Sequence, residues 1–462
     1  MGPTGYKIIR TLRCKNTNLP GTLGRLATAI GDVGASIGNI STVHLGPHFN
    51  VRDIEVLADS KEHLAELIEN VSKLHDVSVL EVRDDVLDAH ESGKIKMAYT
   101  VPVNSLNDLR RVYTPGVAEV CTLIHDEPLW KDAYTIIPYS VAIVTDGTAI
   151  LGLGDIGPVA GMPVMEGKAA LLQQLVGVNG IPILLDTTDP DTIVETVERI
   201  SPTFAAIQLE DIASPRCFPI YERLERELGQ PVMHDDQQGT AVVTLAALVN
   251  ACRIAGVSLQ EARIGVVGLG AAGLTIGKFL LRHTGNPCLG TARTDASRKR
   301  HADCGGIPSS IDEIMEKCDI VVATSGVRDL ISPSMVKKGQ IILALSNPYP
   351  EIAPETAKEA GAALATDGRV VNNLVGYPGM WRGILDSKAV RITYEMYEAA
   401  ALAIVRATPD GELVPSPLDS GVHLAVAHSV ARAALDSGVA RRQLDEDYFA
   451  STDVKEPPWS WR

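Results

Sequence analysis

The chain has 462 residues, 45% of them hydrophobic, and a formal net charge of −15 from 42 Lys and Arg against 57 Asp and Glu. This length is enough for about three domains of roughly 150 residues, and the acidic balance argues against nucleic acid as the main partner, because phosphate binding needs a basic surface. The seven cysteines are dispersed, the first residues lack a secretory signal pattern, and no apolar run reaches the roughly 20 clean residues of a membrane span, so a reduced, cytoplasmic chain without a membrane partner is expected.

Residues 1–85 predict a small α/β domain. Strands are expected over residues 7–14, 36–45, 50–58 and 77–83, and helices over residues 23–32 and 61–74. This βαββαβ order is the ferredoxin-like pattern. The turn Asn18-Leu-Pro-Gly-Thr before the first helix and the run Gly34-Ala-Ser-Ile-Gly after it resemble an ACT domain. The resemblance implies a regulatory module with a small effector, such as an amino acid, at that turn; a pairing module without a ligand is the alternative.

A polar linker over residues 86–98 leads to a catalytic α/β region that we expect over residues 99–240. Tyr113 comes just before Thr114-Pro-Gly in this region. A tyrosine in such a place is either a half-buried anchor or, where a positive charge lowers its pKa from about 10, a general acid.

Lys168 lies in the early turns of an expected helix. Pro158, Gly161 and Pro163 interrupt the preceding segment, so the helix is expected to begin near Val164. Small and apolar neighbours predict a desolvated amine whose pKa is lowered towards neutrality, where it can act as a base. A solvated surface lysine is the alternative.

Two pairs of acidic residues follow short apolar strands. Glu210-Asp211 ends the strand over residues 203–209, and Asp235-Asp236 follows the run Pro-Val-Met-His. Ligands of open α/β sheets gather at the carboxyl ends of strands, so both pairs are expected at one crevice. A divalent cation explains clustered carboxylates better than a helix N-terminus, which stabilises an acid by only about 1 kcal/mol. Ordinary helix capping is the alternative.

Residues 241–400 predict a Rossmann-type, doubly wound dinucleotide-binding domain. An apolar strand leads into a glycine-rich turn, and an amphipathic helix follows. Gly268 makes the tight turn, Gly270 lets the backbone approach the pyrophosphate, and Gly273 allows close packing of the helix. The residues expected against the cofactor are Gly268, Gly270, Ala271, Ala272 and Gly273. A glycine-rich turn without a ligand is the alternative.

The end of the next strand bears on the choice between NADP and NAD. An NAD site needs an acid there for the ribose 2′-hydroxyl, but Ala292 takes that position and Arg293 follows. An arginine suits a 2′-phosphate, so NADP is expected in preference to NAD. A solvated basic turn is the alternative.

Amide side chains follow two later strands, and neutral amides there can hold a substrate carboxylate, although a single Asn-Pro is usually only a turn. These amides belong to Asn347, Asn372 and Asn373. Residues 401–462 are expected to form a helical segment that packs on the catalytic body.

Together these features resemble the malic enzyme family in its shorter bacterial form, with an ACT-like domain added at the N-terminus. The motifs follow the family's order over about residues 99–386. They are Tyr113-Thr-Pro-Gly-Val-Ala, Leu151-Gly-Leu-Gly-Asp, Met165-Glu-Gly-Lys, Leu209-Glu-Asp, His234-Asp-Asp-Gln-Gln-Gly-Thr-Ala, Gly268-Leu-Gly-Ala-Ala-Gly, Leu345-Ser-Asn-Pro and Asn372-Asn.

The resemblance implies oxidative decarboxylation of malate to pyruvate and CO₂ with reduction of NAD(P). Lys168 would be the base that takes the proton from the C2 hydroxyl, Tyr113 the acid that protonates C3, and Asp235 the hydrogen-bond partner of Lys168. The implied ligands of Mg²⁺ or Mn²⁺, acting as a Lewis acid, are Glu210, Asp211 and Asp236. The implied contacts of the substrate carboxylate are Asn347, Asn372 and Asn373, with Asn347 also near the cofactor.

One position departs from the longer family members, which carry an arginine where this chain has Ala149. Related 2-hydroxy diacids therefore stay open as substrates, and so does a malolactic-type reaction in which the hydride is returned. A metabolite sensor without turnover is the rival of another class, but a sensor needs neither Lys168 nor Tyr113 nor clustered acids. The family favours pairing, so a homodimer or a higher even oligomer is expected.

Overall fold

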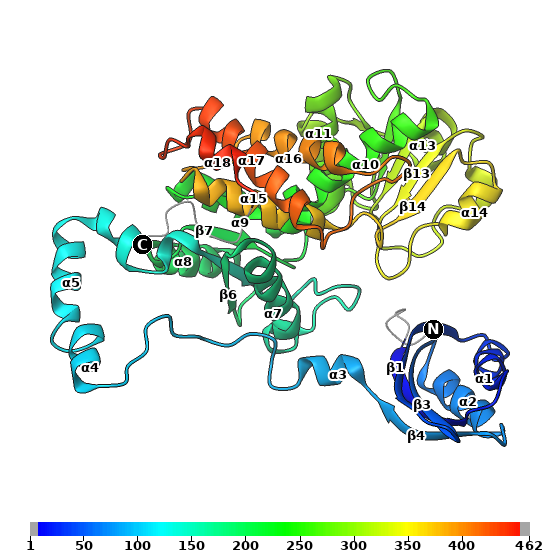
Figure 1. The fold of residues 1–462 in the computed structure, drawn as a ribbon. Helices are drawn as coiled ribbons and strands as arrows, with labels where there is room; N and C mark the ends of the chain where they lie inside the picture. The colour runs from blue at the N-terminus through cyan, green and yellow to red at the C-terminus, as the bar shows by residue number, and fades with distance from the viewer. Residues whose placement is uncertain (1–7, 453–462) are drawn as a thin grey trace. The chain divides into compact units, whose positions relative to one another are not determined.

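The structure is a computed structural model that describes residues 8–452 (Figure 1). The chain forms two compact units, and the boundary between them falls between Lys96 and Met97.

The first unit is a four-stranded antiparallel sheet with two helices. Its elements are β1 (Ile8–Thr17), α1 (Thr22–Gly31), β2 (Ser36–Leu45), β3 (Phe49–Ala58), α2 (Lys61–Ser72) and β4 (Val77–Arg83), followed by α3 (Asp85–His90). In the sheet the strands lie in the order β2-β3-β1-β4. Leu12 and Cys14 of β1 share one hydrophobic core with Leu26 of α1 and Leu67 of α2, because alternate side chains of a strand face the same side.

The second unit contains two parallel sheets, with strand orders β6-β5-β7-β8 and β11-β10-β9-β12-β13-β14. The strands are β5 (Ser140–Thr145), β6 (Asn179–Leu184), β7 (Ala206–Leu209), β8 (Val232–His234), β9 (Ile264–Val267), β10 (Leu289–Thr291), β11 (Ile307–Pro308), β12 (Ile320–Ala323), β13 (Ile341–Ala344) and β14 (Leu364–Asp367). β5 and β9 are buried along their whole length, which explains their continuous apolar sequences. The predicted α/β class with parallel sheets is confirmed.

Helices precede, connect and follow the strands of the second unit (Figure 1). They are α4 (Leu106–Val112), α5 (Val117–Asp126), α6 (Lys131–Tyr134), α7 (Gly157–Val176), α8 (Pro190–Ile200), α9 (Cys217–Glu227), α10 (Thr240–Ala255), α11 (Ala271–Thr284), α12 (Asp295–Asp303), α13 (Ile311–Lys317), α14 (Pro354–Glu359), α15 (Tyr377–Asp386), α16 (Tyr394–Ala407), α17 (Ser420–Asp436) and α18 (Glu446–Ala450). α16 and α17 contact each other, and α17 also contacts α15 and α7.

Helix α7 begins at Gly157, so the prediction that it begins near Val164 was wrong. Pro158 occupies the first turn, where a missing N–H breaks no helical bond. Pro163 lies inside the helix and leaves the carbonyl of Val159 without its usual donor. Val159 is 88% exposed, so water can bond that carbonyl. The longer helix places Lys168 in its middle, with three turns of support before it.

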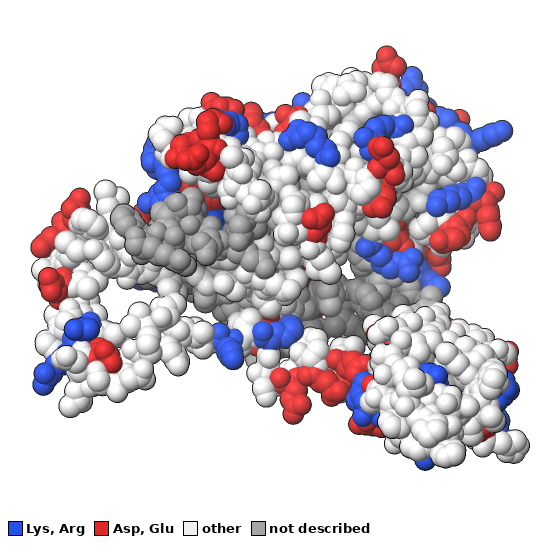
Figure 2. Space-filling view, viewed as in Figure 1, with Lys and Arg blue, Asp and Glu red and all other residues white. Residues whose placement is uncertain are grey.

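Helix α10 and the turn before it, Asp235–Ala255, form the one stretch of the described residues that is long and apolar enough for a membrane span. Of its most apolar window, 72% is buried inside the fold. It is therefore a core helix, as the sequence indicated, and its apolar surface packs against neighbours such as α16 and α11. On the face shown in Figure 2, acidic and basic side chains are interspersed over the unit that contains this helix.

Candidate active site

Three carboxylates meet at the carboxyl edge of the first parallel sheet. β7 pairs with β8, so the residues that follow these two strands lie side by side. Glu210 and Asp211 follow β7, Asp236 follows β8, and one carboxylate oxygen of each lies within 4.8 Å of the other two. Burial raises the pKa of Glu210 well above its usual range. Burial, and then the charge of Asp236, raise the pKa of Asp211 to about 8.

The chemistry of this cluster fits a divalent cation. Like charges taken out of water destabilise each other unless a counterion compensates them. Glu210 and Asp211 are only 2% and 8% exposed, so solvent screens them poorly. Oxygen ligands are those that Mg²⁺ and Mn²⁺ prefer. The residues predicted as metal ligands are thus brought together.

The backbone conformation around these acids orients their carboxylates. Asp211 has a φ of +51°, in the left-handed region, and its N–H donates to Oδ2 of Asp236 over 2.9 Å. The segment Asp235–Gly239 is a π-helical turn before α10, a form that is frequent at functional sites. A Cβ at Gly239 would lie 1.8 Å from Oδ1 of Asp235, so this position excludes a side chain.

Lys168 projects from α7 into the same cluster. Its Nζ lies 3.0 Å from Oε1 of Glu210 and donates to Oδ2 of Asp235. Burial by itself lowers the pKa of Lys168, but the charges of Asp235 and Glu210 outweigh it, so that the pKa is raised well above its ordinary value. The predicted burial is present, whereas the expected fall of the pKa was wrong, because two buried acids lie next to the amine.

Tyr113 is not placed beside Lys168 within this chain. It caps the C-terminus of α4 and is 66% exposed. Figure 1 shows α4 and α5 well away from α7 and α10. The backbone N–H of Tyr113 donates to the carbonyl of Leu109, and its own carbonyl accepts from the N–H of Val117.

The amides approach the cluster from the second sheet. A Cβ built at Gly239 would lie 3.7 Å from Cβ of Asn373, so Asn373 neighbours Asp235. Asn372 accepts a bond from the N–H of Leu374 over 2.9 Å and shapes this turn. Asn347 precedes a cis proline in the loop after β13, and the absence of a side chain at Gly152 lets the loop after β5 reach the carbonyl of Asn347.

A cavity of about 510 Å³ lies at the carboxyl edge of the second sheet, beside β9, where the strand order reverses. Gly268, Gly270 and Arg293 line it. Gly268 has a φ of +99°, and a Cβ there would lie 2.7 Å from the backbone of Ser325, while a Cβ at Gly273 would lie 1.8 Å from the carbonyl oxygen of Gly268. Ala271 and Ala272 open α11 directly after this turn. The cavity has the position expected of a dinucleotide site.

Sequence reasoning missed three buried side chains behind the acids. Tyr377 places its ring centroid 4.6 Å from Nζ of Lys168, and Gln208 and Trp381 form hydrogen bonds that end on Glu210. Gln208 precedes Glu210 by two residues on one strand, and this spacing could have indicated a shared face. Nothing in the sequence connects Trp381 with a residue 173 positions earlier.

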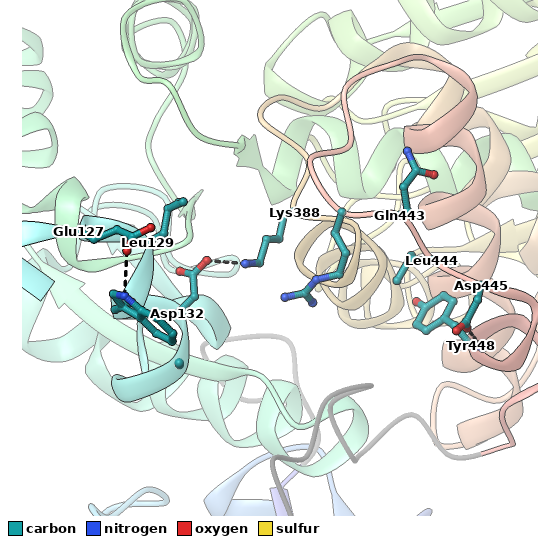
Figure 3. A pocket seen from close by; sticks show the side chains of 11 residues that line it. Glu127, Leu129, Asp132, Lys388, Gln443, Leu444, Asp445 and Tyr448 are labelled. Atoms are coloured by element: carbon teal, nitrogen blue, oxygen red, sulfur yellow. Dashed lines mark hydrogen bonds and ion pairs between the residues drawn. The ribbon is translucent and has the colours of Figure 1, made fainter. Parts of the chain in front are cut away.

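A second cavity, of about 540 Å³, lies away from these residues, beside the C-terminal end of α15 (Figure 3). Lys388 points into it and pairs with Asp132 across it, while Glu127 accepts the indole N–H of Trp130. Its cationic and acidic side chains are mixed, and it holds none of the residues predicted for catalysis.

Comparisons with known proteins agree with the site. Residues 92–225 match the family model for the malic enzyme N-terminal domain, and residues 237–300 match that for the malic enzyme NAD binding domain. The chain is 56% identical over 430 residues to NAD-dependent malic enzyme 1 of Bacillus subtilis (strain 168), which covers 93% of this chain and 98% of that protein. It is 40% identical over 407 residues to the bifunctional malic/malolactic enzyme of the same organism, covering 81% of this chain and 98% of that protein. The crystal structure of malic enzyme from Pyrococcus horikoshii Ot3 superimposes with a TM-score of 0.74 at 37% identity, covering 79% of this chain and 93% of that one.

Proposed function

The chain belongs to the malic enzyme family and catalyses the oxidative decarboxylation of malate with reduction of NAD(P). We propose that this reaction uses a divalent cation bound by the three clustered carboxylates. The observation that carries this proposal is the meeting of Glu210, Asp211 and Asp236 within 4.8 Å, with Lys168 3.0 Å from Glu210. When bound, Mg²⁺ or Mn²⁺ supplies a Lewis acid that polarises the substrate oxygens.

The side chains divide the proton transfers between them. Lys168 accepts the proton of the malate C2 hydroxyl, and a hydride leaves C2 for the nicotinamide ring. Asp235 holds the amine of Lys168 in place through their hydrogen bond. Loss of CO₂ then leaves C3 to be protonated by Tyr113, which yields pyruvate. General acid and base groups of this kind contribute roughly 10²- to 10⁴-fold each.

Lys168 must lose its proton before it can serve as a base. Without a cation, the charges of Asp235 and Glu210 hold its pKa high. Glu210 would hold the cation, and a carboxylate that shares its charge with a cation would attract the ammonium group of Lys168 less, which would favour the neutral amine. Metal loading and base activation are therefore linked at this site.

Asn347 and Asn373 hold the substrate carboxylate, with Asn372 shaping the turn that carries Asn373. Since Ala149 supplies no charge, binding of the substrate carboxylate relies on these amides or on another basic group. The rival reaction is malolactic, in which the reduced cofactor is reoxidised on the enzyme. Purified chain given malate and Mn²⁺ tests this: net formation of reduced cofactor with pyruvate supports the proposal, whereas lactate without net cofactor reduction refutes it.

NADP is preferred to NAD in this proposal. Arg293 lines the crevice, and Ala292 offers no carboxylate to a ribose hydroxyl. The relative at 56% identity is named as NAD-dependent, so the preference needs a direct test. Catalytic efficiency with each cofactor, for the unaltered chain and for Arg293→Ala, decides it. A lower efficiency of Arg293→Ala with NADP alone is expected, and a native preference for NAD contradicts the proposal.

The first unit acts as an ACT-like, ferredoxin-like regulatory domain. Its support is the βαββαβ order and the sheet order β2-β3-β1-β4. An amino acid effector would bind at the turn before α1. The test is calorimetric titration of the full chain with the 20 amino acids, together with malate oxidation in their presence; no heat and no change in rate with any of them contradicts an amino acid effector.

We also propose that the chain is a homodimer or a higher even oligomer, in which Tyr113 reaches the site of a second copy. Support comes from the segment around α4 and α5, where neither helix buries a residue. Large apolar side chains along it are exposed, among them Met97, Leu106, Leu129 and Ile136. Mixing inactive Tyr113→Phe with inactive Lys168→Ala restores part of the activity if Tyr113 acts on a second copy. No restoration under conditions of subunit exchange contradicts this arrangement.

A further inference from the structure

A line of hydrogen bonds reaches Glu210 from a helix that holds none of the proposed catalytic residues. Nε1 of Trp381, on α15, donates to Oε1 of Gln208 over 2.6 Å, and Nε2 of Gln208 donates to Oε2 of Glu210 over 2.7 Å. The side chains are sealed from solvent, with Trp381 and Gln208 at 0% and Glu210 at 2% exposure. The second carboxylate oxygen, Oε1, lies 3.0 Å from Nζ of Lys168.

The chemistry of the three groups permits only one direction for this line. An indole N–H only donates, an amide has one end of each kind, and the carboxylate of Glu210, ionised when it holds a cation, only accepts. Trp381 therefore bonds to the amide oxygen, which turns the amide NH₂ of Gln208 towards Glu210. Without the indole N–H, the side-chain amide of Gln208 could flip and direct its oxygen towards the carboxylate of Glu210. Two buried acceptors would then face each other without a donor.

We propose that Trp381 and Gln208 are positioning residues for the metal ligand Glu210. Together they hold Oε2 and so set the rotation of the carboxylate, which directs Oε1 towards Lys168 and the cation. This inference rests on the proposed metal site.

Helix α15 can hold Trp381 in a fixed position. All ten of its residues are buried, and Arg382, next to Trp381, donates to the carbonyl of Val176 at the end of α7 over 2.9 Å. One turn before Trp381, Tyr377 places its ring 4.6 Å from Nζ of Lys168. Side chains of one helix thus contact Lys168 directly and Glu210 through Gln208.

The experiment measures Mn²⁺ binding to the full chain after removal of bound metal, followed by the electron paramagnetic resonance signal of free Mn²⁺. Partners of metal ligands typically change metal affinity by roughly 10- to 100-fold, so Gln208→Met is expected to raise the Kd by about tenfold or more. Trp381→Phe keeps the ring but removes the donor, and should weaken binding in the same direction. Because both act through one amide, the double variant should bind no more weakly than Gln208→Met.

Tyr448→Phe is the matched control. Its hydroxyl donates to Asp386 at the other end of α15 over 2.8 Å, so its loss removes a buried bond to the same helix without touching Gln208. We expect a lower Tm for this control and an unchanged Mn²⁺ Kd.

The outcomes separate the two proposals. If the unaltered chain binds no Mn²⁺, the metal site is wrong and this inference falls with it. If the unaltered chain binds Mn²⁺ and both Gln208→Met and Trp381→Phe bind equally well, the metal site stands and the positioning role is refuted. If the losses of Mn²⁺ affinity in the two single variants add in the double variant, the two residues do not act through one amide. If the variants have a lower Tm and an unchanged Kd for Mn²⁺, both residues have only a structural role.

Discussion

Replacing Asp211 by Asn should stabilise the metal-free protein while it removes metal binding. Most substitutions of a buried polar residue destabilise a fold, so the sign of the effect is diagnostic. The reason is the cluster of acids, in which burial and the charge of Asp236 raise the pKa of Asp211 to about 8. Asn has the same shape, tolerates the φ of +51° at this position, and keeps the backbone N–H bond to Asp236.

The magnitude follows from proton linkage. A carboxyl group whose pKa is 3.8 when free and about 8 in the fold contributes fully to stability below pH 4, and loses that contribution as the pH rises towards 8. At neutral pH the cost is on the order of 4 kcal/mol before neighbouring acids relax. We therefore expect Asn to recover about 1–3 kcal/mol in the absence of metal, or a rise of a few degrees in Tm.

The assay is thermal unfolding of both chains at pH 5.5 and pH 8, in chelator and again with excess Mn²⁺. In chelator at pH 8 the variant should have the higher Tm, and the difference should shrink at pH 5.5. Mn²⁺ at 1,000 times its Kd adds about 4.1 kcal/mol to the unaltered chain and should reverse the order.

Asp319→Asn is the control, since Asp319 pairs with Lys337 and accepts from the N–H of Arg263 outside the cluster. This control should lower the Tm slightly in chelator and keep the response to Mn²⁺. A lower Tm for Asp211→Asn in chelator at pH 8, with no dependence on pH, would refute the reasoning about uncompensated buried charge.

Three further predictions concern the base, the cofactor turn and the core. Lys168→Ala should lower kcat for malate oxidation by roughly 10²- to 10⁴-fold while dinucleotide binding, measured by fluorescence titration, is retained; full activity would remove the assignment of the base. Gly270→Ala should keep the Tm, because a Cβ there meets nothing within 4 Å, and yet weaken dinucleotide binding where the backbone must approach the pyrophosphate. Its matched variant Gly273→Ala should lower the Tm, because a Cβ there lies 1.8 Å from the carbonyl oxygen of Gly268; equal Tm values would contradict the contrast. Arg382→Met should destabilise the second unit by about 3–5 kcal/mol in chemical unfolding, because it removes the cation that pairs with the buried carboxylate of Asp386; a loss below about 1 kcal/mol would show that the remaining groups around Asp386 suffice.

The local sequence determined a large part of this site. The acids come directly after apolar strands, and parallel strands place their carboxyl ends at one edge, so the sequence predicted that the pairs containing Glu210 and Asp236 would face one crevice. Their roles as metal ligands were implied by the resemblance to the family. The glycines of the dinucleotide turn were equally predictable, since a tight turn and a close helix approach leave no room for a side chain. Such features depend on a few neighbouring residues and on rules common to all parallel sheets.

Only the tertiary structure decided the environment of these residues. The pKa of Lys168 depends on the distance to two acids from other strands, and a window of small apolar neighbours therefore indicated the wrong direction. Trp381 reaches Gln208 across 173 positions of the chain, and Tyr113 is left exposed although its motif is intact. Hydrogen bonds and charge interactions act over a few ångströms in space, and the packing of whole elements sets which groups come within that reach.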